Sequence, residues 1–116
     1  MRTITVCVEA LGAGLSRFQQ VWQSGAAEGE FVTFESMEGL HQVLTPNRWA
    51  LIRRLQAEGP LAIRELARRL HRDVKRVHED VAKLKDLGLV EDAEGGGVWV
   101  PYDEIRAELI LKRPAA

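Results

Sequence analysis

The strongest periodic pattern of apolar residues lies in the middle of the chain. Four of them recur there at intervals of three and four residues: Ile63, Leu66, Ala67 and Leu70. This spacing places them on one face of a helix, so it predicts an amphipathic helix over residues 63–70. An earlier helix is predicted to begin at Thr45-Pro46, because threonine can cap a helix and proline fits its first turn. That helix should end at Gly59-Pro60.

A longer helix is predicted over residues 73–87, after a tight connection that contains His71. Asp73 can cap its start, and Gly88 just past its end favours a left-handed stop. Five apolar residues are expected to face the core: Val74, Val77, Val81, Leu84 and Leu87. On a helical wheel, the residues that point away from this stripe are Lys75, Glu79, Ala82 and Asp86. The pattern therefore predicts two helices joined by a short turn, the second with a largely charged outer face.

A hairpin is predicted after these helices. Two short β-like runs, residues 89–92 and 98–100, flank the glycine-rich segment 93–97. Helix, tight turn, helix and hairpin in this order are typical of a helix-turn-helix followed by a wing. Apolar and charged residues then alternate over residues 105–111, which favours a strand, although a short helix also fits because Ala, Glu and Leu tolerate both.

The amino-terminal part has a different pattern. Runs of β-branched and aromatic residues predict strands over residues 3–9 and 31–34. Helical spacing predicts a helix over residues 15–22 between them, and a short helix over residues 38–44 follows. No internal repeat and no long linker divides the chain. The sequence therefore predicts an α+β protein.

Composition narrows the class of protein. The chain has 116 residues, of which 46% are hydrophobic and 28% charged, as in globular proteins. No segment approaches the roughly 18 apolar residues that span a bilayer, and the amino terminus lacks the apolar run of a signal peptide. Cys7 is the single cysteine and has no intrachain partner, which suits a reducing compartment. We therefore expect a cytoplasmic protein without membrane contact.

Charge is distributed unevenly along the chain. Residues 46–90 contain 11 basic and six acidic residues, a net charge of +5. Residues 1–45 and 91–116 each carry a net charge of −3. A basic centre suits a nucleic-acid partner, although a run of solvated helices would give the same count.

Particular strings of residues carry a family resemblance. Residues 63–90 resemble the winged-helix core of MarR-like transcriptional regulators. The chain is more similar still to a small group of predicted winged-helix regulators in archaea and bacteria. That group shares a Thr-Pro-x-Arg-Trp helix start (residues 45–49), an Arg-Asp-x-x-x-Val-x-x-Asp-Val segment (residues 72–81) and a Val-Pro-Tyr-Asp string (residues 100–103). Two departures are His71, where many such proteins have glycine, and an acidic wing over residues 91–97.

The resemblance implies an organisation in three parts. Residues 45–101 would form the winged helix-turn-helix that binds DNA. Residues 1–44 would be an additional strand-helix-strand segment suited to dimerisation, and residues 102–116 a carboxy-terminal strand and tail. The resemblance also implies that the recognition helix, residues 73–87, enters the major groove of double-stranded DNA.

Seven residues follow as candidate DNA contacts. The pose that the resemblance implies brings Lys75, Arg76 and His78 to base edges or phosphates, and Glu79 to a cytosine amino group. Three further cations would hold phosphates: Arg64, Arg72 and Lys83. The alternative is that these are ordinary solvated residues, with Lys75 and Glu79 paired to each other one helical turn apart.

Motifs for other chemistry are weak or missing. Gly12-x-Gly14 follows a predicted strand, but Arg17 stands where a dinucleotide fingerprint needs its third glycine. No second parallel strand–helix–strand unit fits the remaining length. The three histidines lack metal-ligand spacing, and no acid/base pair stands out. We therefore predict no catalytic activity, no metal and no cofactor.

The functional prediction is a dimeric repressor of transcription. A single recognition helix contacts few base pairs, so a homodimer on a pseudo-palindromic operator is expected. Two alternatives stay open. Some members of the group that the chain resembles lie beside toxin genes, so an antitoxin that binds a basic toxin protein and its own promoter is one. An adaptor whose winged helix contacts protein rather than DNA is the other.

Overall fold

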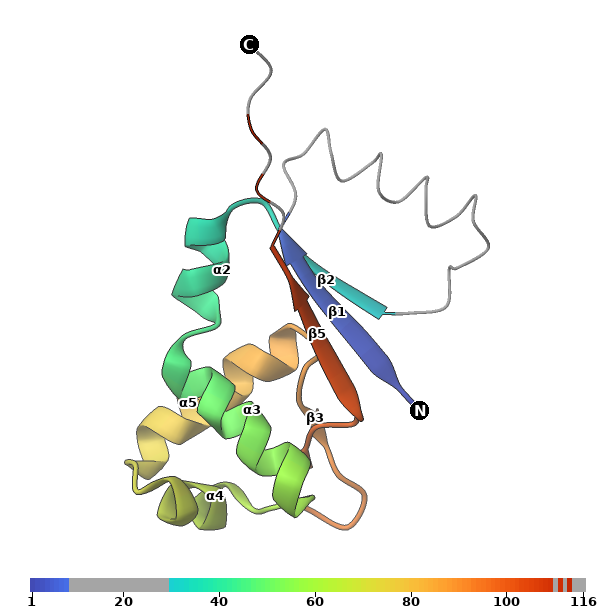
Figure 1. The fold of residues 1–116 in the computed structure, drawn as a ribbon. Coiled ribbons are helices and arrows are strands. Elements are labelled where there is room, and N and C mark those ends of the chain that lie inside the picture. Colours follow the sequence, from blue (N-terminus) through green and yellow to red (C-terminus); the bar gives the residue numbers. More distant parts are fainter. Residues whose placement is uncertain (9–29, 110, 112, 114–116) are drawn as a thin grey trace. The chain divides into compact units, whose positions relative to one another are not determined.

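A computed structural model describes residues 1–8, 30–109, 111 and 113 (Figure 1). The chain divides into two compact units. The first comprises Met1–Gln42 together with Glu104–Ala116, and the second comprises Val43–Asp103. The helix predicted over residues 15–22 and the Gly12-x-Gly14 motif lie outside the described residues.

The first unit contains a three-stranded sheet. Strands β1 (Thr3–Val8), β2 (Glu30–Phe34) and β5 (Glu104–Glu108) lie in the order β2-β1-β5, with β1 between its two neighbours (Figure 1). The central strand is paired along both of its edges, and it buries Ile4 and Val6, which are β-branched residues that favour strands. All three predicted strands are thus confirmed, and the helical alternative for residues 105–111 is wrong.

All pairing in this sheet is parallel. We expected no second parallel strand–helix–strand unit, and that expectation missed the third parallel strand. Parallel neighbours need long crossover connections. The whole second unit lies between β2 and β5 in sequence, so β5 joins β1 after a connection that no local pattern reveals. The first unit also includes most of the short helix α2 (Met37–Val43), which begins where Ser36 Oγ accepts a hydrogen bond from Gly39 N at 3.0 Å.

The second unit begins with helix α3 (Pro46–Glu58). Thr45 caps it as predicted, since its hydroxyl accepts a hydrogen bond from Arg48 N at 3.3 Å. The helix ends at Gly59, whose φ of 73° suits a residue without a side chain. Its buried side chains are Leu51, Ile52 and Leu55.

Helices α4 (Ile63–Leu70) and α5 (Val74–Asp86) are joined by a three-residue turn. His71 takes the left-handed conformation that ends α4, with φ 54° and ψ 45°. Its amide donates to Arg68 O, and the Arg72 amide donates to Ala67 O at 3.0 Å. Asp73 then caps α5 by accepting a hydrogen bond from Arg76 N at 3.3 Å. The predicted pair of helices and its tight turn are therefore confirmed.

The buried faces of these helices follow the predicted stripes, with one correction. Leu66 and Ala67 of α4 are buried, as are the three α5 residues Val77, Val81 and Leu84. Val74 was expected in the core but is 43% exposed. It is the first residue of α5, so no helical turn precedes it to continue the buried stripe.

A short hairpin follows α5. Strands β3 (Glu91–Asp92) and β4 (Val98–Trp99) pair antiparallel, which confirms the hairpin although its strands are shorter than predicted. Leu61, between α3 and α4, pairs with Val98 through two backbone hydrogen bonds of 2.9 and 3.0 Å. Gly97 lies so close that a Cβ there would be 2.8 Å from Leu61 O. The base of the hairpin is therefore fixed to the loop between α3 and α4.

Residues beyond α5 complete the core of the second unit. Gly88 has φ 80° and ends the helix as predicted. Leu89 and Val90 are then fully buried. The Tyr102 hydroxyl donates a hydrogen bond to Gly88 O at 3.0 Å, which ties the end of the unit to this turn. Helices and small sheets together confirm an α+β fold. Among the described residues, no helix has the length and apolar character to cross a membrane.

Candidate nucleic-acid interface

The basic residues of the second unit fall into two groups. Residues 43–103 contain 11 lysines and arginines. Six of them form ion pairs within the unit: Arg48, Arg54, Arg68, Arg69, Arg72 and Lys85. Exposed ion pairs are weak, so this division shows which cations already have a carboxylate partner and which have none.

The most enclosed pairing joins Arg48 and Arg72 to the single carboxylate of Asp80. Arg48 Nε lies 3.0 Å from Asp80 Oδ1, and Arg72 Nη2 lies 2.8 Å from Asp80 Oδ2. The three side chains are 13–20% exposed. Arg48 Nη1 also donates to Val43 O at 2.6 Å. This triad connects α3, the turn before α5 and α5 itself.

The triad changes the role expected of Arg72. We predicted that this residue holds a phosphate, yet its guanidinium is largely enclosed and engaged with Asp80. Its place in the structure favours support of α5 over contact with a ligand. No local pattern in the sequence indicated the contact between Arg48 and Asp80, because the two residues are 32 positions apart. In the sequence, the two residues were marked only as specified positions of the motifs that carry the family resemblance.

A second set of pairs links α3 to α4. Glu58 accepts from Arg69 at 2.7 Å and from Arg54 at 2.9 Å. Glu65 binds Arg68 and also accepts from Arg69 Nε at 2.9 Å. The hydrogen bond from Arg68, followed by that from Arg69, lowers the pKa of Glu65 from its usual 4.5 to about 2. Both carboxyl groups are therefore ionised near neutral pH and hold these arginines on the surface of the unit.

The remaining basic residues have no ion pair or side-chain hydrogen bond within the described part of the chain. They are Arg53, Arg64, Lys75, Arg76 and Lys83. Four of these five belong to the predicted DNA contacts, and all of them are exposed. Lys75, Arg76 and Lys83 all lie on α5, while Arg64 lies in the first turn of α4.

The other two predicted contacts are also on α5. His78 and Glu79 are exposed, as the helical wheel predicted. The alternative pairing of Lys75 with Glu79 is not formed, although the two residues are one turn apart. The amino-terminal half of α5 therefore presents two unpaired cations, one histidine and one carboxylate to its surroundings. The amino-terminal end of a helix adds a partial positive charge there.

The hairpin has the opposite charge. Lys85 Nζ, on α5, contacts both carboxylate oxygens of Asp92 at 2.9 and 3.0 Å. Glu94 is exposed near the hairpin tip, where Gly95, Gly96 and Gly97 all have positive φ. No lysine or arginine lies between Asp86 and Glu104. The hairpin itself thus contains no basic residue, and the unpaired cations of the second unit lie on α3, α4 and α5.

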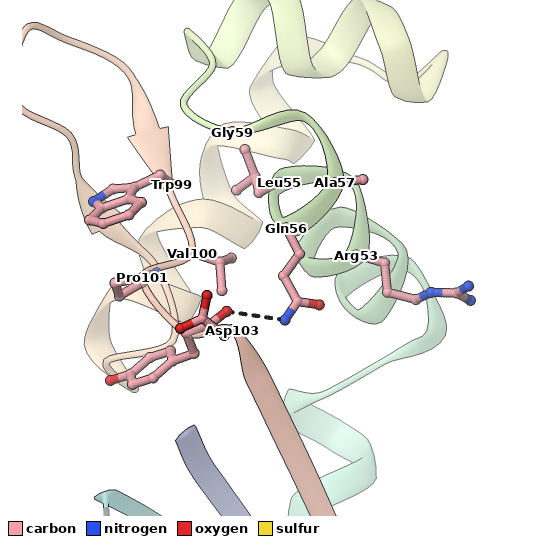
Figure 2. Close-up of a pocket in the computed structure, with 10 residues that line it drawn as sticks. Arg53, Leu55, Gln56, Ala57, Gly59, Trp99, Val100, Pro101 and Asp103 are labelled. Carbon is pink, nitrogen blue, oxygen red and sulfur yellow. Dashed lines mark hydrogen bonds between the residues drawn. The ribbon is translucent and has the colours of Figure 1, made fainter. Parts of the chain in front are cut away.

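A hollow of about 490 Å³ lies between the carboxy-terminal half of α3 and the strand that leaves the hairpin. Figure 2 shows Trp99 and Pro101 on one wall and Gln56 on the other. Gln56 Nε2 donates to Tyr102 O at 3.3 Å, and the guanidinium of Arg53 points away from Trp99. No sequence pattern predicted this hollow, because its walls are some forty residues apart in sequence. Its lining includes Arg53 and Asp103 as well as apolar side chains, and the amide of Gln56 is already bonded.

Comparison with known proteins gives a match to a protein family. The model of the family described as HVO_A0114 matches residues 43–107, which is more than half of the chain. No curated protein and no solved structure matches the chain. The matched residues include the whole second unit, with the Asp80 triad and the unpaired cations.

Proposed function

The chain belongs to the HVO_A0114 family, and we propose that residues 43–103 form a winged helix-turn-helix that binds double-stranded DNA and regulates transcription. The order of elements supports this proposal. Helices α4 and α5 are joined by a three-residue turn, and a hairpin follows directly. In such a unit the second helix enters the major groove, which is about 12 Å wide and accommodates a helix. Helix α5 is then the recognition helix, and β3 and β4 form the wing.

The observation that carries the proposal is the set of unpaired cations. Six of the 11 basic residues are engaged with carboxylates, whereas Lys75, Arg76 and Lys83 project from α5 without a partner among the described residues. Exposed cations on one helix suit a polyanion that runs alongside it. Carboxylates pair with the cations elsewhere in the unit, but not with these three residues of α5.

Each exposed residue then has a distinct task. Lys75 and Arg76, near the start of α5, contact base edges, and an arginine that binds guanine through two hydrogen bonds contributes about 1–3 kcal/mol of discrimination. Lys83 and Arg64 contact phosphates and fix the position of the helix. His78 and Glu79 lie one turn further along, where Glu79 can accept from a cytosine amino group. Arg72 supports α5 from within the protein.

We further propose that the protein acts as a homodimeric repressor. One recognition helix contacts few base pairs. In a homodimer, two copies of the same helix contact the two half-sites of a two-fold operator, which doubles the number of base pairs contacted. The first unit, which the family model matches only in part, provides residues outside the DNA-binding unit for self-association.

Fluorescence anisotropy on duplexes from the DNA upstream of the protein's own gene tests this proposal. The variant is Lys75→Ala/Arg76→Ala. The matched control is Arg54→Ala/Arg68→Ala, which removes the same charge from residues already paired with Glu58 and Glu65. We expect salt-dependent binding for the parent and the control. The Lys75→Ala/Arg76→Ala variant should lose preference over a scrambled duplex and have a log–log salt slope lower by about 1–2.

Two outcomes would contradict the proposal. Absence of salt-dependent binding by the parent would remove DNA as the partner and favour the adaptor that contacts protein. Equal losses in the variant and the control would mean that total charge, not the outer face of α5, determines binding.

A further inference from the structure

The exposed valine at the start of α5 is the one apolar residue of that helix that departs from the predicted core stripe by a wide margin. Val74 is 43% exposed, whereas Val77 and Val81 are buried to within 2%. A single exposed apolar side chain is common on protein surfaces and needs no explanation by its presence alone. Its surroundings on this helix are what make it informative.

Val74 lies next to the candidate DNA contacts. Lys75 and Arg76 follow it directly, and His78 lies one helical turn further on the same flank, since successive residues are 100° apart. All three of these neighbours are exposed. A ligand that engages His78 therefore also reaches the branched methyl groups of Val74, because side chains four positions apart share one side of the helix.

We propose that Val74 is a specificity-determining residue that contacts the C5 methyl group of a thymine in the major groove. This inference rests on the proposed function, in which α5 enters that groove. Thymine is the one unmodified base that presents an apolar group there, and apolar side chains are its recognised partners. The adjacent cations hold the phosphates and polar base edges, so the valine adds preference for thymine without adding charge.

The experiment uses the full-length protein and a duplex that the protein itself selects from a pool with a random central segment. Each thymine of the selected duplex is replaced in turn by deoxyuridine, which lacks only the methyl group. Binding is measured for the parent and for Val74→Ser, which removes both methyl groups of the valine, because a threonine methyl could itself contact thymine. Thermal unfolding followed by circular dichroism checks that the variant keeps its fold.

The expected result is a specific coupling between one residue and one methyl group. At one thymine of each half-site, loss of the methyl should weaken binding by the parent about three- to fivefold. The same replacement should change binding by Val74→Ser by less than about a factor of two. Thymines outside the selected segment serve as the control and should tolerate replacement in both proteins.

The inference is overturned if no deoxyuridine replacement weakens the parent, if the parent and Val74→Ser lose affinity equally, or if the selected site has no thymine. Each of these results leaves the proposed function intact, because the protein still selects a DNA sequence. If no duplex is selected at all, the proposed function fails, and the thymine contact fails with it.

Discussion

Replacing Asp80 by asparagine tests the idea that an enclosed ion triad fixes the position of α5. The substitution keeps the size of the side chain but removes the charge that Arg48 and Arg72 share at 3.0 and 2.8 Å. Removing one partner of a buried ion pair costs about 3–5 kcal/mol, because an unpaired charge is left behind. The triad is 13–20% exposed, so water relieves part of this cost. We expect the free energy of unfolding to fall by about 2–4 kcal/mol.

Urea unfolding followed by circular dichroism measures this change, with Asp86→Asn as the matched control. Asp86 is on the same helix and carries the same charge, but it is exposed and has no ion pair among the described residues. Its replacement should change stability by less than about 0.5 kcal/mol. Equal effects of Asp80→Asn and Asp86→Asn would show that the triad contributes no more to stability than an unpaired surface charge, and the role of Arg72 as a support of α5 would be refuted.

Three further predictions concern the turn, the hairpin and the helix surface. His71→Gly should stabilise the protein by about 0.5–1 kcal/mol in urea unfolding, because glycine adopts φ 54° without the cost that an L side chain has there. Gly97→Ala should destabilise it by about 1–3 kcal/mol more than Gly95→Ala, since both glycines have positive φ but only Gly97 would place a Cβ 2.8 Å from a backbone oxygen. Arg68 and a second arginine hold the pKa of Glu65 at about 2, so the stability from this carboxylate is complete above pH 4.5 and is lost as the pH falls towards 2. In acid titrations of stability, Glu65→Gln should flatten this part of the profile.

Local signals predicted most of the second unit. Thr45 and Asp73 cap helices through their own side chains, and Gly88 ends one through its own φ. Caps and stops of this kind depend on residues within four positions of each other, which a single sequence displays directly.

Long-range contacts were beyond such signals. The pairing of β1 with β5 joins residues about a hundred positions apart, and nothing in either strand specifies a parallel neighbour. The exposure of Val74 was missed for a related reason. Its spacing fits the apolar stripe of α5, but spacing alone does not show whether the first residue of a helix meets the core.

The motif over residues 72–81, which carries part of the family resemblance, distinguishes the residues that hold α5 in place from those on its exposed face. The specified positions of the segment from Arg72 to Val81 are the ones that the structure pairs, uses as a cap or buries: Arg72, Asp73, Val77, Asp80 and Val81. The unspecified positions between them are all exposed: Val74, Lys75, Arg76, His78 and Glu79. The motif thus defines how the helix is held and leaves its outer face free to vary. If α5 is the recognition helix, proteins that share the motif should hold it in the same place and bind different DNA sequences. Exchanging the five exposed residues between two such proteins should then exchange the sequences that they select.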